Sequence, residues 1–168
     1  NLDCVYNTGT VKVTGGTFAG VMTAIYNTTT GRLEVEGGTL SVTAGGFPSG
    51  DKCTIKNYGE GQVKVTGGTV KSGYGASSYN KGGSSIINYG NGLIEIEENA
   101  NIADNDGGYE TIMNKAAGNV YIRGGTVGSG EICNSGTGHI YITGGTILNV
   151  VKNNSTGRLN ITGGTIIS

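Results

Sequence analysis

Residues 25–40 read IYNTTTGRLEVEGGTL, and this stretch decides the fold. An aliphatic residue stands two positions before Asn27, and Gly31 follows that asparagine by four positions. Leu33 and Val35 then alternate with charged residues, and a Gly-Gly-Thr triplet closes the unit. The alternation predicts a short, half-buried strand, and the adjacent glycines predict a sharp bend after it.

The same pattern repeats along the whole chain. It recurs most plainly at residues 55–70, 112–127, 132–147 and 151–166. Seven copies align on an asparagine with an aliphatic residue two positions before it, and six of them end in Gly-Gly-Thr. The fourth copy instead reads EENAN at residues 97–101. The copies differ in length almost wholly between the triplet and the next asparagine, which predicts loops there and a constant framework elsewhere.

Short strands at fixed offsets favour a solenoid over a sandwich. If each copy stacks on the next, every strand pairs in parallel with its equivalent about 4.8 Å away, and the aliphatic residues form continuous columns. A left-handed helix of this kind would show a stricter six-residue period. We therefore predict an all-β fold, a right-handed parallel β-helix of about seven coils. Residues 1–168 would form one β-helix domain, a segment of a longer protein.

The asparagines predict a column at one corner of the coils. An inward asparagine there can donate and accept along the stack and satisfy backbone groups that the bend exposes. The alternative is a row of amides that bind a ligand. The column comprises Asn27, Asn57, Asn88, Asn114, Asn134 and Asn153, with Asn7 as its first member.

Counting back from the glycines identifies the outward side chains. Three positions before them, charges alternate in sign over the first four copies, from Lys12 to Glu95, which predicts attraction between neighbouring coils. Tyr121 and Tyr141 follow in the same column. One position before the glycines, Glu97 and Arg123 are neighbours. Such ladders can simply set the register and keep the sheet soluble.

The tyrosines predict a binding surface. Tyr121 is expected to stack on Tyr141, with Arg123, His139 and Asn119 on the same face. Aromatic faces beside polar groups suit sugar rings, although stacked tyrosines can also simply cover a sheet. Tyr6 with Tyr26, and Tyr58 with Tyr89, make two further neighbouring pairs beside the asparagine corner.

Composition excludes several classes of partner. The net charge is −1 and no basic run occurs, so no nucleic-acid footprint is present. No apolar stretch approaches the roughly 20 residues that span a bilayer, and we predict no membrane insertion. The three cysteines, Cys4, Cys53 and Cys133, fall at different places in the repeat, which argues against a disulfide framework and a paired-cysteine metal site.

Catalytic and metal-binding signals are weak. His139 has no carboxylate or serine partner in its own copy, and no hydrolase, phosphate-binding or metalloprotease motif occurs. We predict no catalytic residue and no cofactor. The one metal candidate is calcium at Asp104 and Asp106, within ADNDGG, where oxygen ligands alternate before a glycine. These aspartates also belong to an acidic group that would form the cleft of a β-helix polysaccharide lyase or hydrolase, the rival interpretation. That group comprises Glu95, Glu97, Glu98, Asp104, Asp106 and Glu110.

The TGGT and xxNxxxGxVxVxGGT repeats resemble the Gly-Gly-Thr β-helix segments of large surface proteins of Gram-positive, gut-type bacteria. The resemblance covers essentially the whole chain except the irregular fourth copy. It implies an extracellular or cell-surface location, a role in adhesion or structural spacing, and a glycan or a host or neighbouring surface as partner.

Two further expectations concern the threonines and the chain end. The threonines after the glycines form a rank that raises a minor alternative, an ice-binding or fibre-forming solenoid, although the glycines should bend the chain beside it. Because the sequence stops at TGGTIIS without a capping segment, we expect a continuing chain or end-to-end self-association.

Overall fold

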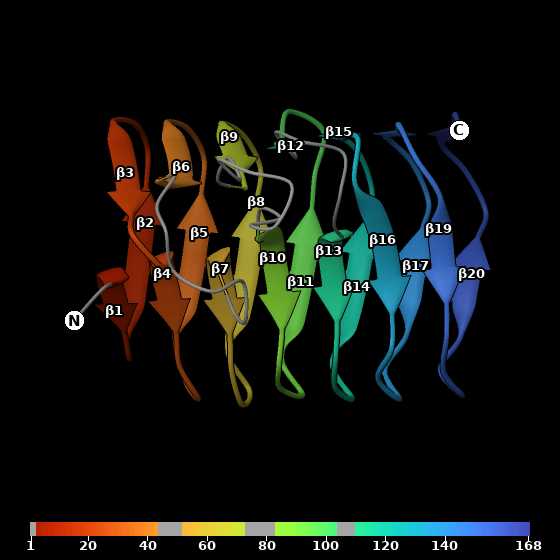
Figure 1. Ribbon diagram of the computed structural model, residues 1–168, viewed down its shortest axis with the longest axis horizontal. Coiled ribbons are helices and arrows are strands. Elements are labelled where there is room, and N and C mark those ends of the chain that lie inside the picture. Colours follow the sequence, from red (N-terminus) through yellow and green to blue (C-terminus); the bar gives the residue numbers. More distant parts are fainter. Residues whose placement is uncertain (1–2, 44–51, 73–82, 104–109) are drawn as a thin grey trace.

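The fold is a stack of three parallel β-sheets. The computed structural model describes residues 3–43, 52–72, 83–103 and 110–168, which contain 21 strands and no helix. Each coil contributes one strand to each sheet, and all pairs between coils are parallel. Figure 1 shows the coils following one another along a rod, from the N-terminal end to the C-terminal end. The predicted all-β parallel β-helix of about seven coils is confirmed.

Three sheets of seven strands run along the rod, and we name them A, B and C. Sheet A comprises β1 (Asp3–Asn7), β4 (Thr23–Asn27), β7 (Cys53–Asn57), β10 (Ser84–Asn88), β13 (Glu110–Asn114), β16 (Glu131–Asn134) and β19 (Val151–Asn153). Sheet B comprises β2 (Thr10–Val13), β5 (Arg32–Val35), β8 (Gln62–Val65), β11 (Leu93–Ile96), β14 (Asn119–Ile122), β17 (Ile140–Ile142) and β20 (Leu159–Ile161). Sheet C comprises β3 (Thr17–Gly20), β6 (Thr39–Val42), β9 (Thr69–Lys71), β12 (Asn101–Ala103), β15 (Thr126–Val127), β18 (Thr146–Ile147) and β21 (Thr165–Ile166).

Equivalent positions of successive copies lie side by side. Ile25 pairs with Ile55, and Asn27 pairs with Asn57, on neighbouring strands of sheet A. Glu34 likewise lies beside Lys64 in sheet B. This register places every repeated residue type in a column that runs the length of the rod.

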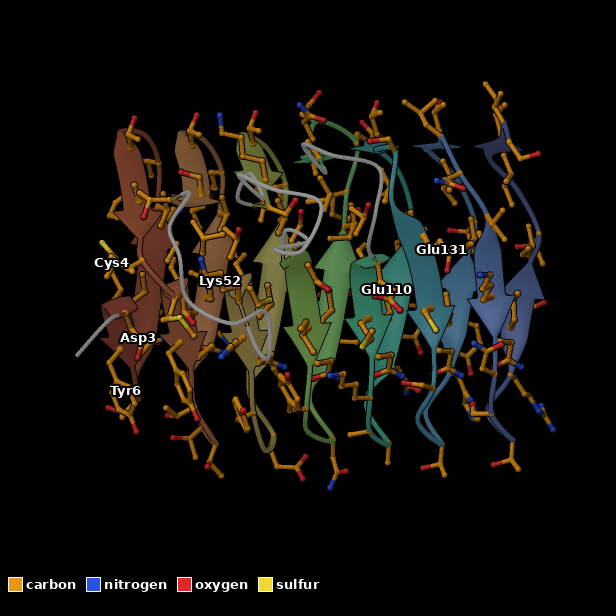
Figure 2. The ribbon with its side chains drawn as sticks, viewed as in Figure 1. Asp3, Cys4, Tyr6, Lys52, Glu110 and Glu131 are labelled. Atoms are coloured by element: carbon orange, nitrogen blue, oxygen red, sulfur yellow. The ribbon has the colours of Figure 1, made fainter. Side chains whose placement is uncertain are left out.

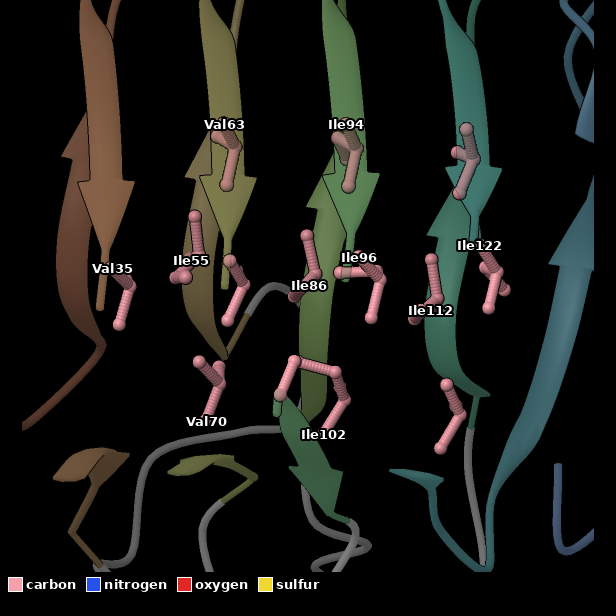
Figure 3. Packing of buried hydrophobic residues seen from close by; sticks show 14 of the residues in the cluster. Val35, Ile55, Val63, Val70, Ile86, Ile94, Ile96, Ile102, Ile112 and Ile122 are labelled. Carbon is pink, nitrogen blue, oxygen red and sulfur yellow. The ribbon is translucent and has the colours of Figure 1, made fainter. Parts of the chain in front are cut away.

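The columns of aliphatic residues form the core. Ile55, Ile94 and Ile102, one from each sheet, are fully buried and belong to one continuous hydrophobic cluster. Figure 3 shows these side chains converging on the space between the strands, coil after coil. Since a single coil has no neighbour to cover its apolar face, burial here depends on stacking.

Glycine makes the corner between sheets B and C. Gly38 has φ of +83°, and a Cβ added there would lie 2.7 Å from the carbonyl oxygen of Gly16 in the preceding coil. Only glycine fits such a left-handed position against a neighbouring backbone. The threonines that follow the glycines pair with one another in sheet C, whereas those that precede the glycines follow the strands of sheet B.

The fourth coil turns the same corner without a Gly-Gly pair. Five positions separate Ile96 from Asn101, whereas four separate Val65 from Thr69. Asn101 still pairs with Thr69 in sheet C, so the extra residue stays in the turn. Among the described residues, only glycines adopt a positive φ. The longer turn therefore avoids the left-handed conformation that requires glycine elsewhere.

Candidate functional site

The asparagines form a continuous hydrogen-bonded ladder inside the corner between sheets A and B. The Nδ2 group of Asn57 donates to Oδ1 of Asn88 at 3.0 Å and to the carbonyl oxygen of Gly61 at 2.7 Å. The same links join the other members, and the asparagines from Asn7 to Asn134 are buried. Side-chain amides thus satisfy one another and the backbone of the corner. The ladder runs through Asn7, Asn27, Asn57, Asn88, Asn114, Asn134 and Asn153.

Four tyrosines stack outside this corner. The sequence predicted two pairs, Tyr6 with Tyr26 and Tyr58 with Tyr89, and the structure joins them into one stack. The rings of Tyr26 and Tyr58 lie 4.9 Å apart at an angle of 11°. Tyr26 precedes its ladder asparagine and Tyr58 follows its own, but both positions point outward. Because the rings cover one another, the inner faces of this stack are closed to a sugar ring.

Figure 2 shows Tyr6, a residue of β1, at the N-terminal end of the rod. At the other end of the stack, the ammonium group of Lys115 lies 5.0 Å from the centroid of the Tyr89 ring. That distance suits a cation–π contact. The stack is therefore closed by a cation at one end and is open only at Tyr6.

Tyr121 and Tyr141 form a second stack, on the outer face of sheet B. Their centroids are 4.7 Å apart, with an angle of 10° between the rings. The Arg123 guanidinium lies 4.7 Å from the centroid of Tyr121 and reaches back to Glu95 in the preceding coil. Since Tyr141 belongs to the following coil, Arg123 and Tyr141 cover opposite faces of Tyr121. Among the described residues, no aromatic ring or cation stacks on the other face of Tyr141, which points toward its register partner Asn160.

His139 and Asn119 lie beside these tyrosines at the start of their strands. The backbone N–H of His139 donates to Oδ1 of Asn119 at 3.0 Å, and the N–H of Arg158 donates to Nδ1 of His139 at 2.9 Å. The His139 ring meets Tyr141 edge-on, with centroids 6.0 Å apart. These contacts hold the imidazole in place through its Nδ1 atom and its edge-on contact with Tyr141. The structure thus brings together all five predicted binding residues: Asn119, Tyr121, Arg123, His139 and Tyr141.

These five residues form what we call the tyrosine patch of sheet B. Arg123 links this patch to the acidic residues of the fourth coil. Its Nη1 lies 2.5 Å from Oε1 of Glu95 and 3.3 Å from Oε1 of Glu97. The sequence predicted the neighbour Glu97 but not the closer contact with Glu95. The hydrogen bond that Arg123 donates to Glu95 is the main cause that raises the pKa of Arg123 above its ordinary value. Arg123 is therefore a fixed cation that orients two carboxylates and one aromatic ring.

A similar contact stands at the N-terminal end of sheet B. Lys12 Nζ lies 2.7 Å from Oε1 of Glu36 and 3.9 Å from Oε2 of Glu34. The hydrogen bond to Glu36 raises the pKa of Lys12. Both partners are substantially exposed, so the pair contributes little to stability.

The predicted calcium ligands, Asp104 and Asp106, lie outside the described residues. Within the described ranges, no three histidine, cysteine or acidic side chains gather as a metal site would require. The described part of the chain also has no helix long and apolar enough to cross a membrane.

The cysteines are free thiols in two different settings. Cys4 is exposed, whereas Cys53 and Cys133 are buried. Burial raises the pKa of Cys53 to about 12, and burial also raises the pKa of Cys133. A buried thiol that keeps its proton is a poor nucleophile, so neither buried cysteine is suited to nucleophilic chemistry.

Comparisons with protein-family models, with curated proteins and with solved structures find no match for this chain. Its candidate site consequently rests on the geometry of sheet B.

Proposed function

We propose that this chain is a non-enzymatic β-helix module of an extracellular or cell-surface protein, which serves adhesion or structural spacing and contacts glycans. The observation that carries the proposal is the open ring face of Tyr141, bordered by polar groups that are already held in place. Aromatic faces suit the apolar faces of sugar rings, and neighbouring polar groups can pair with hydroxyls.

The rod is suited to display this face. Each coil is tied to the next by backbone pairing in three sheets, by the asparagine ladder and by the aliphatic columns. A surface built on such strands keeps its geometry better than one built on loops. The extracellular setting is supported by the resemblance of the Gly-Gly-Thr repeats to bacterial surface proteins.

The rival proposal, a polysaccharide lyase or hydrolase, needs a free acid or base in the acidic group of the fourth coil. Glu95 and Glu97 are both engaged by the same guanidinium nitrogen of Arg123. Asp104 and Asp106 lie outside the described residues. Of the other two members, Glu98 is exposed and Glu110 is half-buried, and neither forms an ion pair among the described residues. The two carboxylates nearest the tyrosines are thus occupied by Arg123, which favours binding over catalysis on this face.

A glycan array tests the proposal, together with lyase and hydrolase assays on acidic polysaccharides. We expect binding without turnover, and a loss of roughly tenfold in affinity for Tyr141→Ala, since aromatic contacts contribute up to about 1.5 kcal/mol. Tyr26→Ala is the matched control, because Tyr26 is also stacked but lies away from sheet B's patch. Turnover of any polysaccharide, or equal losses for both variants, would refute the proposal.

A further inference from the structure

A second feature of sheet B lies two coils before the tyrosines. A hollow of about 250 Å³ opens over β5 and β8. Leu33 and Val63 contribute to its lining although their side chains are buried in the core, so its floor is strand backbone. Its walls are polar and consist of Arg32, Glu34, Gln62, Lys64 and Glu95.

Lys64 has no carboxylate partner in this hollow. Its register neighbours are Glu34 and Glu95, on the strands to either side. Glu34 lies 3.9 Å from Lys12, and Glu95 lies 2.5 Å from Arg123. Within the described parts of the chain, Lys64 forms no ion pair within 4.0 Å. Its acidic neighbours are thus directed to other cations.

Arg32 is the second cation of the hollow. Its Nη2 donates to Oε1 of Gln62 at 2.8 Å, and Gln62 is an uncharged partner. Arg32 likewise forms no ion pair with any described carboxylate. The hollow therefore holds two cations with no described carboxylate within 4.0 Å, beside two carboxylates that contact other cations. Glu34 shares Lys12 with Glu36, and Glu95 shares Arg123 with Glu97.

This combination fits one class of ligand. An anionic group on the ligand would pair with Lys64 and Arg32, and its hydroxyls would donate to Glu34 and Glu95. A neutral sugar would leave the cations unpaired, and a simple anion would have no donors for the carboxylates. We infer that the hollow is a subsite for an acidic sugar of the uronate class, an inference that rests on the proposed glycan-binding function.

The hollow and the tyrosines lie on one track. Lys64, Glu95, Tyr121 and Tyr141 are successive register partners in the same outward column. Three strand spacings separate the first from the last, about 14 Å. An acidic oligosaccharide that lies along the rod can therefore place a carboxylate at Lys64, pass the edges of the stacked Tyr121 and Tyr141 rings, and reach the face of Tyr141 that points toward Asn160.

Calorimetric titration of the whole chain tests this inference. The probes are oligomers of galacturonate, glucuronate and mannuronate, each beside its methyl ester, which keeps the sugar backbone and removes the charge. We expect at least one acid to bind tenfold or more tightly than its ester. Lys64→Gln should abolish that preference, whereas Lys152→Gln should keep it, because Lys152 is ion-paired with Glu131 on sheet A and lies outside the hollow.

Each other outcome overturns a specific claim. If acid and ester bind alike and Tyr141→Ala still weakens both, the acidic subsite is wrong while glycan binding stands. If Lys64→Gln leaves the preference unchanged, the charge is recognised elsewhere and the subsite is again wrong. If no oligosaccharide binds, and the glycan array is also negative, the proposed function and this inference fail together.

Discussion

Asn57 donates its side-chain amide to Oδ1 of Asn88 across 3.0 Å, although 31 residues separate the two in the sequence. This link is one step of a ladder that passes through all seven coils. Its role is to satisfy a buried corner where the strands of sheets A and B meet.

Replacement of Asn57 by alanine should therefore destabilise the fold. The change removes the acceptor for Asn27 and the donor to Gly61 and Asn88, all within a buried corner. Unsatisfied buried groups cost about 1–3 kcal/mol each, so we expect a loss of about 2 kcal/mol or more in the free energy of unfolding. Denaturant unfolding measures it. Asn91→Ala, at an exposed asparagine, is the control and should change stability by less than about 0.5 kcal/mol.

Gly38→Ala tests the corner between sheets B and C. Its positive φ and its closeness to the backbone of the preceding coil predict a loss of about 1–3 kcal/mol. Gly15→Ala is the matched control, because Gly15 has ordinary φ and a Cβ there would meet nothing within 4 Å. A thermal melt of both variants should separate them. Similar melting temperatures would show that the corner does not require glycine.

Much of this architecture could be predicted from the sequence. The alternation of Leu33 and Val35 with polar residues gave the strand, and the constant offset to Asn27 gave the register of the stack. Repetition made this prediction possible, because all copies carry the same residue pattern. A copy that departs from the pattern can still be aligned by its neighbours.

The contacts on the outer surface were less predictable. Tyr26 stacks on Tyr58 although they occupy different positions of the repeat. Arg123 approaches Glu95 more closely than Glu97. In both cases a long side chain can reach two outward neighbours at similar distances. Which neighbour it contacts depends on its rotamer, and the pattern of residue types does not determine the rotamer. Lys64 lacks an ion-pair partner for the same reason, because its neighbours Glu34 and Glu95 contact Lys12 and Arg123 instead.

The cysteines should differ sharply in reactivity. At mildly alkaline pH we expect Cys4 to react rapidly with a thiol reagent, and Cys53 and Cys133 to react only on unfolding, because both are buried. Mass spectrometry of the labelled native chain measures this. Rapid labelling of more than one thiol in the folded protein would contradict the burial.

Cys53 should also make stability depend on pH at the alkaline end. Burial raises its pKa to about 12 from an ordinary value of 9.0, so the folded chain keeps a proton that the unfolded chain loses. The contribution of the neutral thiol is complete below pH about 9 and is lost as pH rises toward 12, by at most about 1.4 kcal/mol per pH unit. We expect wild type to lose stability more steeply over this range than Cys53→Ala. Parallel curves for the two proteins would contradict the raised pKa.

Arg123→Gln should have a small effect on stability. Exposed ion pairs contribute about 0.2–1 kcal/mol each and are weakened by salt, so we expect a loss of about 1 kcal/mol at low salt and less at high salt. Unfolding curves at two salt concentrations measure it. A much larger loss, unchanged by salt, would mean that Arg123 is a structural support for the coil.

The most direct test of glycan binding on sheet B is an NMR titration of the chain with a uronate oligosaccharide, followed by measurement of the oligosaccharide's length. We predict shift changes that run along the outer face of sheet B, from Arg32 and Lys64 to Tyr141, and an oligosaccharide of unchanged length. Shift changes confined to another face, or the appearance of shorter sugars, would contradict the proposal.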